Sequence, residues 1–188
     1  MTNKRYIALL RGVNVGRAKR VAMADLRKLV EDIGYADVRS VLNSGNIVFS
    51  AGDLDPNAAA TAIEEGLVLK LGVAARVMVI AGEELAAVLA ENPLLHLATD
   101  HARLLVFLLT DASVRTAVAP LCERDWGEGA LALGQRAAYV WCPEGVLDSA
   151  AAAALGKQLG DATTSRNWNT LCKLYALCAE PVPAPRGA

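Results

Sequence analysis

Residues 6–26 read YIALLRGVNVGRAKRVAMADL, and this stretch decides how the first half of the chain folds. Its first five residues are apolar and have the length of a buried strand. Two glycines follow in a short loop, and apolar residues at helical spacing begin at Met23. The stretch therefore predicts a strand, a glycine-containing loop and a helix. Such a loop is either a plain connector or a place where backbone N–H groups face a ligand.

The remainder of the first half completes a βαββαβ pattern. Gly34 follows the last apolar position of the first helix and is the residue type that commonly ends one. The later elements are, in chain order, strands Val38–Leu42 and Ile47–Ser50 around an Asn-Ser-Gly-Asn loop, a helix between Asp55-Pro56 and Gly72, and a strand at Ala75–Ile80.

The second half repeats this order less regularly. The strand Arg103–Leu109 is apolar on both faces, which predicts that both faces of its sheet are covered, either within the chain or by a homodimer. The other expected elements are helices at Glu83–Glu91, after Asp111, from about Leu147 to Leu159 and at Trp168–Cys178, with strands at Ala130–Leu133, Ala137–Cys142 and Thr163–Thr164.

We therefore predict an α+β protein made of two tandem ferredoxin-like βαββαβ units with antiparallel sheets. Residues 1–81 form the first unit. Residues 82–179 form the second, together with a linking helix and a C-terminal helix. Residues 180–188, which alternate proline with small residues, are expected to be a disordered tail.

The composition is that of an ordinary folded protein, with 54% hydrophobic and 21% charged residues. No apolar run approaches the ~20 residues that span a bilayer, and no secretory signal precedes Arg11, so a cytoplasmic location without a membrane partner is expected. Cys122, Cys142, Cys172 and Cys178 lack the spacing of a metal site or a disulfide framework. Neither a metal nor a cofactor is expected.

Positive charge gathers near the N-terminus, although the formal net charge of the chain is −1. Residues 1–46 contain nine Lys or Arg against four Asp or Glu, and four of these cations lie in or just after the first loop. Two interpretations remain open for this cluster. It is either a solvated basic face or a local site for an anion.

The predicted topology places two loops at the same end of the first sheet. In a βαββαβ unit, the loop after the first strand and the hairpin between the second and third strands share one end, so residues 11–16 and 43–46 should lie close together. Glycines and a helix N-terminus favour an anion there. The candidate ligand-binding residues are Arg11, Gly12, Asn14, Gly16, Arg17, Ser44, Gly45 and Asn46. A simple glycine turn is the alternative.

A third polar stretch, TTSRNWNT at residues 163–170, precedes the last helix. Ser165 or Asn167 would cap that helix while Trp168 packs into the core. Alternatively, Arg166, Asn167, Trp168 and Asn169 bind a planar or phosphorylated ligand, as a second wall of the same site.

Four segments of the chain resemble the signatures of a bacterial family known as domain of unknown function 1697. They are RGVNVG at residues 11–16, MADL at residues 23–26, SGNIVF at residues 44–49 and RNWNT at residues 166–170. The resemblance runs through the chain in order and implies paired ferredoxin-like units, but no established activity. Arg17 stands where the family often has a further glycine.

These observations favour an uncharacterised protein that binds a small anionic ligand, phosphorylated or carboxylated, at the glycine-containing loops. Nucleic-acid binding through the basic N-terminal half is one alternative, although Tyr6 and Phe49 are the only aromatics available to a base-stacking sheet. A structural or protein-interaction module is another. Catalysis finds little support, because no nucleophile lies near His96 or His101 in the sequence. Whether the protein is an enzyme stays open, because one sequence does not show which loops meet in the fold.

Overall fold

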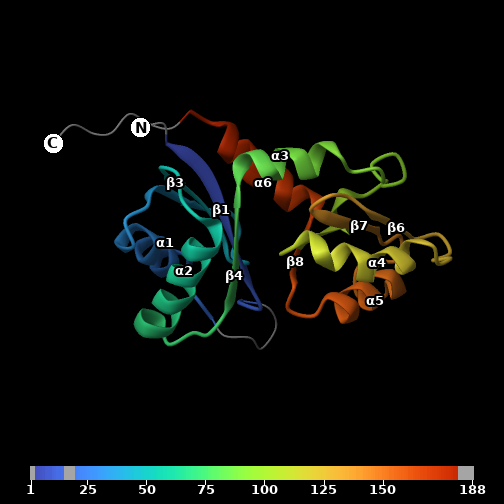
Figure 1. Ribbon diagram of the computed structural model, residues 1–188, viewed down its shortest axis with the longest axis horizontal. Coiled ribbons are helices and arrows are strands. Elements are labelled where there is room, and N and C mark those ends of the chain that lie inside the picture. The colour runs from blue at the N-terminus through green and yellow to red at the C-terminus, as the bar shows by residue number, and fades with distance from the viewer. Residues whose placement is uncertain (1–2, 15–19, 182–188) are drawn as a thin grey trace. The chain divides into compact units, whose positions relative to one another are not determined.

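The structure is a computed structural model that describes residues 3–14 and 20–181 (Figure 1). These residues contain two four-stranded antiparallel sheets and six α-helices, so the predicted α+β class is confirmed. They divide into two compact units. One holds the residues up to Leu85 together with those from Lys173 onward, and the other holds Ala86–Cys172.

The first unit has the predicted βαββαβ topology. Its sheet has the order β2-β3-β1-β4, and every neighbouring pair is antiparallel, as in ferredoxin-like folds. The elements are β1 (Lys4–Arg11), α1 (Met23–Asp32), β2 (Ala36–Ser40), β3 (Asn46–Ala51), α2 (Pro56–Leu71) and β4 (Arg76–Ala81).

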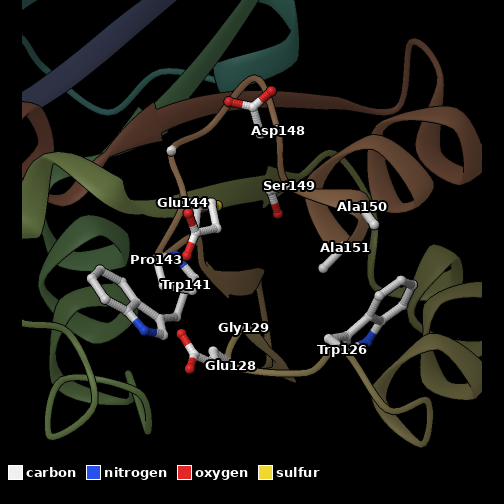
Figure 2. A pocket seen from close by; sticks show the side chains of 12 residues that line it. Trp126, Glu128, Gly129, Trp141, Pro143, Glu144, Asp148, Ser149, Ala150 and Ala151 are labelled. Carbon is white, nitrogen blue, oxygen red and sulfur yellow. The ribbon is translucent and has the colours of Figure 1, made fainter.

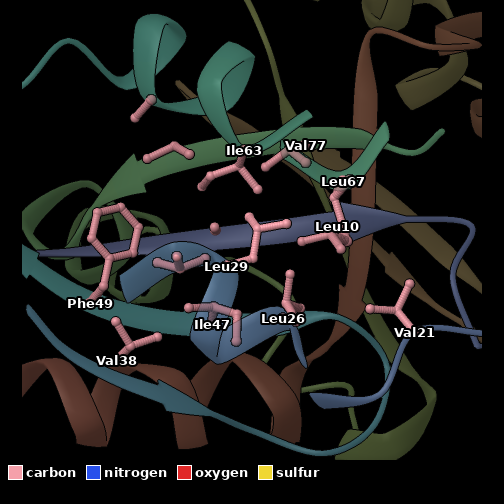
Figure 3. Packing of buried hydrophobic residues seen from close by; sticks show 14 of the residues in the cluster. Leu10, Val21, Leu26, Leu29, Val38, Ile47, Phe49, Ile63, Leu67 and Val77 are labelled. Carbon is pink, nitrogen blue, oxygen red and sulfur yellow. The ribbon is translucent and has the colours of Figure 1, made fainter. Parts of the chain in front are cut away.

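The core of the first unit lies between this sheet and helices α1 and α2 (Figure 3). Alternate residues of β1 face the helices, because successive side chains of a strand point to opposite faces. Phe49 is fully buried and stacks on Tyr6 and Tyr35, with ring centroids 5.8 Å and 4.5 Å away. Ile7 and Leu9, on the other face of β1, are also fully buried, so both faces of this strand are covered.

The two helices of the first unit begin differently. The Asp55 side chain accepts a hydrogen bond from the backbone N–H of Asn57, which caps α2, and Pro56 occupies the first helical position. The residue before α1, Ala22, has the extended backbone of an N-cap but no side chain that can accept such a bond. Among the described residues, no side chain therefore caps the N-terminus of α1.

The second unit repeats the same sheet order, β6-β7-β5-β8. Helix α3 (Gly82–Ala90) leads into it, and α6 (Trp168–Ala179) leads out of it. Its core packs α4 and α5 against one face of the sheet, and all six residues of β5 are buried. The remaining elements are β5 (Leu104–Leu109), α4 (Arg115–Cys122), β6 (Ala130–Leu133), β7 (Ala137–Trp141), α5 (Ala150–Leu159), β8 (Thr163–Asn167) and two short 3₁₀ helices, His101–Arg103 and Ala112–Val114.

The last residues described belong again to the first unit. A side chain at Gly82 would lie 3.3 Å from Cβ of Cys178, so α6 passes close to the start of α3. Beyond the helix, Glu180 forms an ion pair with Arg39 of β2. Most of the expected disordered tail, from residue 182 on, lies outside the described residues.

Three elements differ from their expected bounds for an identifiable structural reason. Strand β2 covers Ala36–Ser40 rather than Val38–Leu42, because a bulge at Asp37 shifts its pairing with β3. Helix α5 begins at Ala150, where Ser149 caps it, and not near Leu147, which is 98% exposed. Strand β8 extends to Asn167, because its polar residues pair with the buried strand β5 at the edge of the sheet.

Residues 3–14 and 20–181 contain no helix with both the length and the apolar character needed to cross a membrane.

Candidate functional site

Two loops of the first unit meet, as the topology predicts. We call residues 11–14 and 43–46 the loop pair. The backbone N–H of Leu10 donates to the carbonyl of Gly45 at 2.8 Å, and the side-chain amide of Asn14 donates to the carbonyl of Asn43 at 2.7 Å. The candidate residues Arg11, Gly12 and Asn14 therefore lie beside the candidates of the hairpin loop. Gly16 and Arg17 lie outside the described residues.

Asn14 braces the loop from within. Its Oδ1 accepts the backbone N–H of Val21 at 2.8 Å, and its Nδ2 donates to the carbonyl of Val21 at 2.8 Å as well as to that of Asn43. The amide thus joins both ends of the segment that precedes α1 to the neighbouring hairpin. Asn14 holds the loop pair together, which is a positioning role.

Gly45 and Asn46 brace the hairpin side of the loop pair. A Cβ atom at Gly45 would lie 2.7 Å from Cβ of Leu10 and 2.8 Å from Cγ2 of Val13, so only glycine fits. Asn46 is fully buried, and its Nδ2 donates to the carbonyl of Val41 at 2.9 Å and to Oγ of Ser44 at 2.8 Å. These contacts fix the conformation of the hairpin loop in the structure.

Arg11 and Gly12 differ from these bracing residues. Gly12 is exposed, has a φ of +70°, and has open space where a side chain would be. Arg11 ends β1 and pairs in register with Arg76, the first residue of β4. Arg76 lies 3.4 Å from a carboxylate oxygen of Glu64, whose other oxygen accepts the backbone N–H of Val77 at 2.8 Å.

Arg76 is a cation that the sequence analysis missed. The first and last strands of a βαββαβ unit are antiparallel neighbours, so the start of the last strand always lies beside the end of the first. Applied to the sequence, this rule alone would have placed Arg76 next to Arg11.

The polar stretch before α6 lies in the second unit, and its groups largely serve the local structure. Oδ1 of Asn167 accepts the backbone N–H of Thr170 at 2.9 Å and its hydroxyl at 2.7 Å, so Asn167 is the helix cap. Nη1 of Arg166 donates to the carbonyl of Ser165 at 2.8 Å, and burial lowers the pKa of Arg166 to about 10. Trp168 is buried, whereas Asn169 is exposed.

Aromatic side chains in the first sheet do not form a base-stacking platform. Tyr6 and Phe49 are 3% and 0% exposed, and both belong to the core that faces α1 and α2. RNA-binding sheets of this topology stack bases on exposed aromatics of the corresponding strands. The first sheet therefore lacks that means of binding RNA.

A pocket of about 270 Å³ lies in the second unit, and none of the sequence candidates lines it (Figure 2). Trp126 lies on one side and Glu144 on the other. Glu128, Asp148 and the first residues of α5 complete the lining. The pocket is built from three segments near residues 126–129, 141–145 and 148–151, which only the folded sheet brings together.

The described residues contain no group of three or more His, Cys, Asp or Glu placed to hold a metal ion. All four cysteines are free, and burial raises the pKa of each thiol, to about 11 for Cys178. A raised pKa keeps a thiol protonated and weakly reactive at neutral pH.

Comparison with known proteins identifies the family. Residues 3–139 match the family described as a protein of unknown function, DUF1697. The chain belongs to this family. The matched range includes the RGVNVG and SGNIVF segments but ends before RNWNT at residues 166–170.

This DUF1697 protein also resembles a solved structure, that of the conserved bacterial protein SP0830 from Streptococcus pneumoniae. The two are 24% identical with a TM-score of 0.76, and the match covers 94% of this chain and 99% of the other. At this identity the likeness establishes a shared fold. No curated protein matches the chain.

Proposed function

We propose that the protein binds a small anionic ligand, phosphorylated or carboxylated, at the loop pair of the first unit. The observation that carries the proposal is the cross-strand pairing of Arg11 with Arg76 beside the two loops. Directly opposite residues of an antiparallel pair are close enough to act on one ligand, so Arg11 and Arg76, which also contacts Glu64, can both donate to the same anionic group.

The nearby N-terminus of α1 supports the same chemistry. Backbone N–H groups in the first turn of a helix attract anions, and Ala22, the N-cap residue of α1, has no side chain that accepts from them. The bonds of Asn14 and Asn46 hold the loops in place before a ligand arrives, which reduces the entropy lost on binding. In this proposal Arg11, Gly12 and Arg76 face the ligand, while Asn14, Gly45 and Asn46 position the loops.

The proposal includes a cytoplasmic site of action, which the four free cysteines support because thiols stay reduced there. Arg166–Asn169 are left out of the proposed site. Asn167 caps α6, and Arg166 donates hydrogen bonds to its neighbours on β8.

Backbone-amide NMR of the full chain, titrated with inorganic phosphate and separately with acetate, tests the proposal. We expect shifts at Gly12, Asn14 and Gly45. The Arg11→Gln/Arg76→Gln double variant should weaken phosphate binding about tenfold or more, since each charge-assisted contact contributes roughly 1.5 kcal/mol or more.

Lys4→Gln is the matched control, because Lys4 is an exposed cation at the opposite end of β1 and should leave the affinity unchanged. Unperturbed loop-pair amides with both anions would refute the proposal. Diffuse, salt-sensitive shifts with short DNA or RNA oligomers instead would favour nucleic-acid binding by the basic surface.

A further inference from the structure

The pocket of the second unit is lined by acidic groups that have no partner among the described residues. Glu128, Glu144 and Asp148 are its three ionisable acids, and no Lys, Arg or His lines it. Within the part of the chain that the structure describes, none of the three carboxylates takes part in a hydrogen bond or an ion pair. Other acids are engaged: Glu64, for example, accepts a backbone N–H and contacts Arg76. The pocket therefore carries negative charge that no residue among 3–14 and 20–181 pairs with.

One wall of the pocket is a fixed indole ring. Nε1 of Trp126 donates to the carbonyl of Leu121 at 2.9 Å, which sets the orientation of the ring. The guanidinium carbon of Arg124, a residue outside the lining, lies 6.0 Å from the ring centroid. The Trp126 ring thus already forms a cation–π contact with the guanidinium group of Arg124.

A close approach of two segments and a helix cap shape the backbone around the pocket. A Cβ atom at Gly129 would lie 3.1 Å from the carbonyl oxygen of Trp141, so the absence of a side chain lets these segments approach closely. Ser149 accepts the backbone N–H of Ala152 at 3.1 Å and caps α5. The Ser149 hydroxyl therefore occupies one backbone N–H group of the helix N-terminus at the pocket.

We propose that this pocket binds a small organic cation, an ammonium or guanidinium group attached to an apolar part. The carboxylates of Glu128, Glu144 and Asp148 supply the negative charge that attracts the cationic group, and the apolar part rests on Trp126 and the small side chains that begin α5. A volume of about 270 Å³ lies just below the ~300–1,000 Å³ typical of ligand pockets, which limits the ligand to a small molecule. The described residues offer no metal site, so an organic cation fits better than a metal ion.

NMR of the full chain with n-butylammonium as the probe tests this proposal. We expect saturable shifts at the Trp126 indole N–H and at the amides of Gly129, Gly145 and Ala151. The neutral molecule 1-pentanol, of similar size and shape, serves as the matched ligand. The ammonium should bind at least about tenfold more tightly than the alcohol, equivalent to roughly 1.4 kcal/mol.

The Glu144→Gln/Asp148→Asn double variant should weaken butylammonium binding at least about tenfold, and added salt should weaken it further. Both side chains are exposed, so the variant is expected to fold. Glu123→Gln removes an exposed carboxylate outside the pocket and should change nothing. The proposal would be overturned by equal binding of the alcohol, by unchanged affinity in the double variant, or by no localised shifts at millimolar probe.

Discussion

At the scale of single residues, two glycines of the loop pair have similar backbones but different surroundings. Gly45 and Gly12 have φ values of +76° and +70°, yet a Cβ atom would clash only at Gly45. Gly45→Ala should therefore lower the free energy of unfolding by about 3 kcal/mol, and Gly12→Ala by about 1 kcal/mol, the cost of a strained backbone alone. Urea unfolding of both variants measures the difference. Equal losses would show that the close contact with Leu10 and Val13 relaxes without cost.

A buried ion pair makes a second residue-scale prediction. Arg5, with a side chain 6% exposed, lies 2.5 Å from Asp37 and donates to Oγ of Ser50 at 3.0 Å. Asp37→Asn keeps a residue type that tolerates the φ of +47° but leaves Arg5 without its counter-charge.

We expect Asp37→Asn to cost about 3 kcal/mol, since a lone buried charge is poorly solvated. The Arg5→Met/Asp37→Asn double variant should recover most of that loss in urea unfolding. A double variant as unstable as the single one would assign the loss to Asp37 and its contact with Arg39 instead.

Residue types show which loops are polar. They do not show whether a polar side chain binds a ligand or forms hydrogen bonds with the protein's own backbone. Asn14, Asn46 and Asn167 were candidates for ligand binding because an amide both donates and accepts hydrogen bonds. The same property lets each of them brace its own backbone, and the structure records such bonds for all three. Only coordinates separate the two uses, because both place an asparagine in a glycine-containing loop or before a helix.

At the scale of elements, the uncapped start of α1 links stability to ligand binding. Ala22 already has the extended backbone of an N-cap, with φ −69° and ψ 134°. Ala22→Ser and Ala22→Asp should both raise the free energy of unfolding by about 0.5–1 kcal/mol. Only the aspartate adds a negative charge, so it should weaken phosphate binding at the loop pair more than serine does. Equal phosphate affinities would place the anion away from this helix end.

Element types followed from periodicity, whereas some boundaries depended on tertiary contacts. The caps Asp55 and Gly72 predicted both ends of α2, because capping is a local interaction. The bulge in β2 instead depends on Asp37, whose partner Arg5 is distant in sequence. Strand β8 is polar because it lies at the edge of its sheet, and edge position is a property of the completed fold.

At the scale of the whole molecule, stability should fall in alkaline solution. Burial raises the pKa of Tyr139 above its usual value of 10.0, and Glu91 beside the hydroxyl adds to the effect. Burial also raises the pKa of Cys178 to about 11 from 9.0. Each group keeps its proton longer in the folded chain than in the unfolded chain. The stabilisation is complete below the unfolded pKa values and is lost as pH rises above them.

Urea unfolding from about pH 8 to about pH 10.5 should show this decline. The Tyr139→Phe/Cys178→Ser double variant should show a flatter pH dependence, although it is less stable at neutral pH because the bonds of Tyr139 to Val88 and Glu91 are lost. An unchanged slope would assign the decline to other groups.

The sheet topology could be predicted from the order of strands and helices, since few arrangements of a βαββαβ pattern exist. That order also predicted that the two loops of the first unit meet. The pocket of the second unit could not be predicted in this way. In the sequence, its acidic residues cannot be told apart from ordinary exposed residues. They line one pocket with Trp126 only after the hairpin and α5 have packed together.

The return of the chain to the first unit has a consequence for how the protein is made. Synthesis runs from the N-terminus, so the first sheet is complete once Ala81 has left the ribosome. Cys178, which lies against Gly82, and Glu180, which pairs with Arg39, are translated only after the whole second unit. The first unit is therefore incomplete until the second unit has been synthesised. A message cut short within the second half would yield a nascent chain with an unfinished first unit, a substrate for cellular quality control.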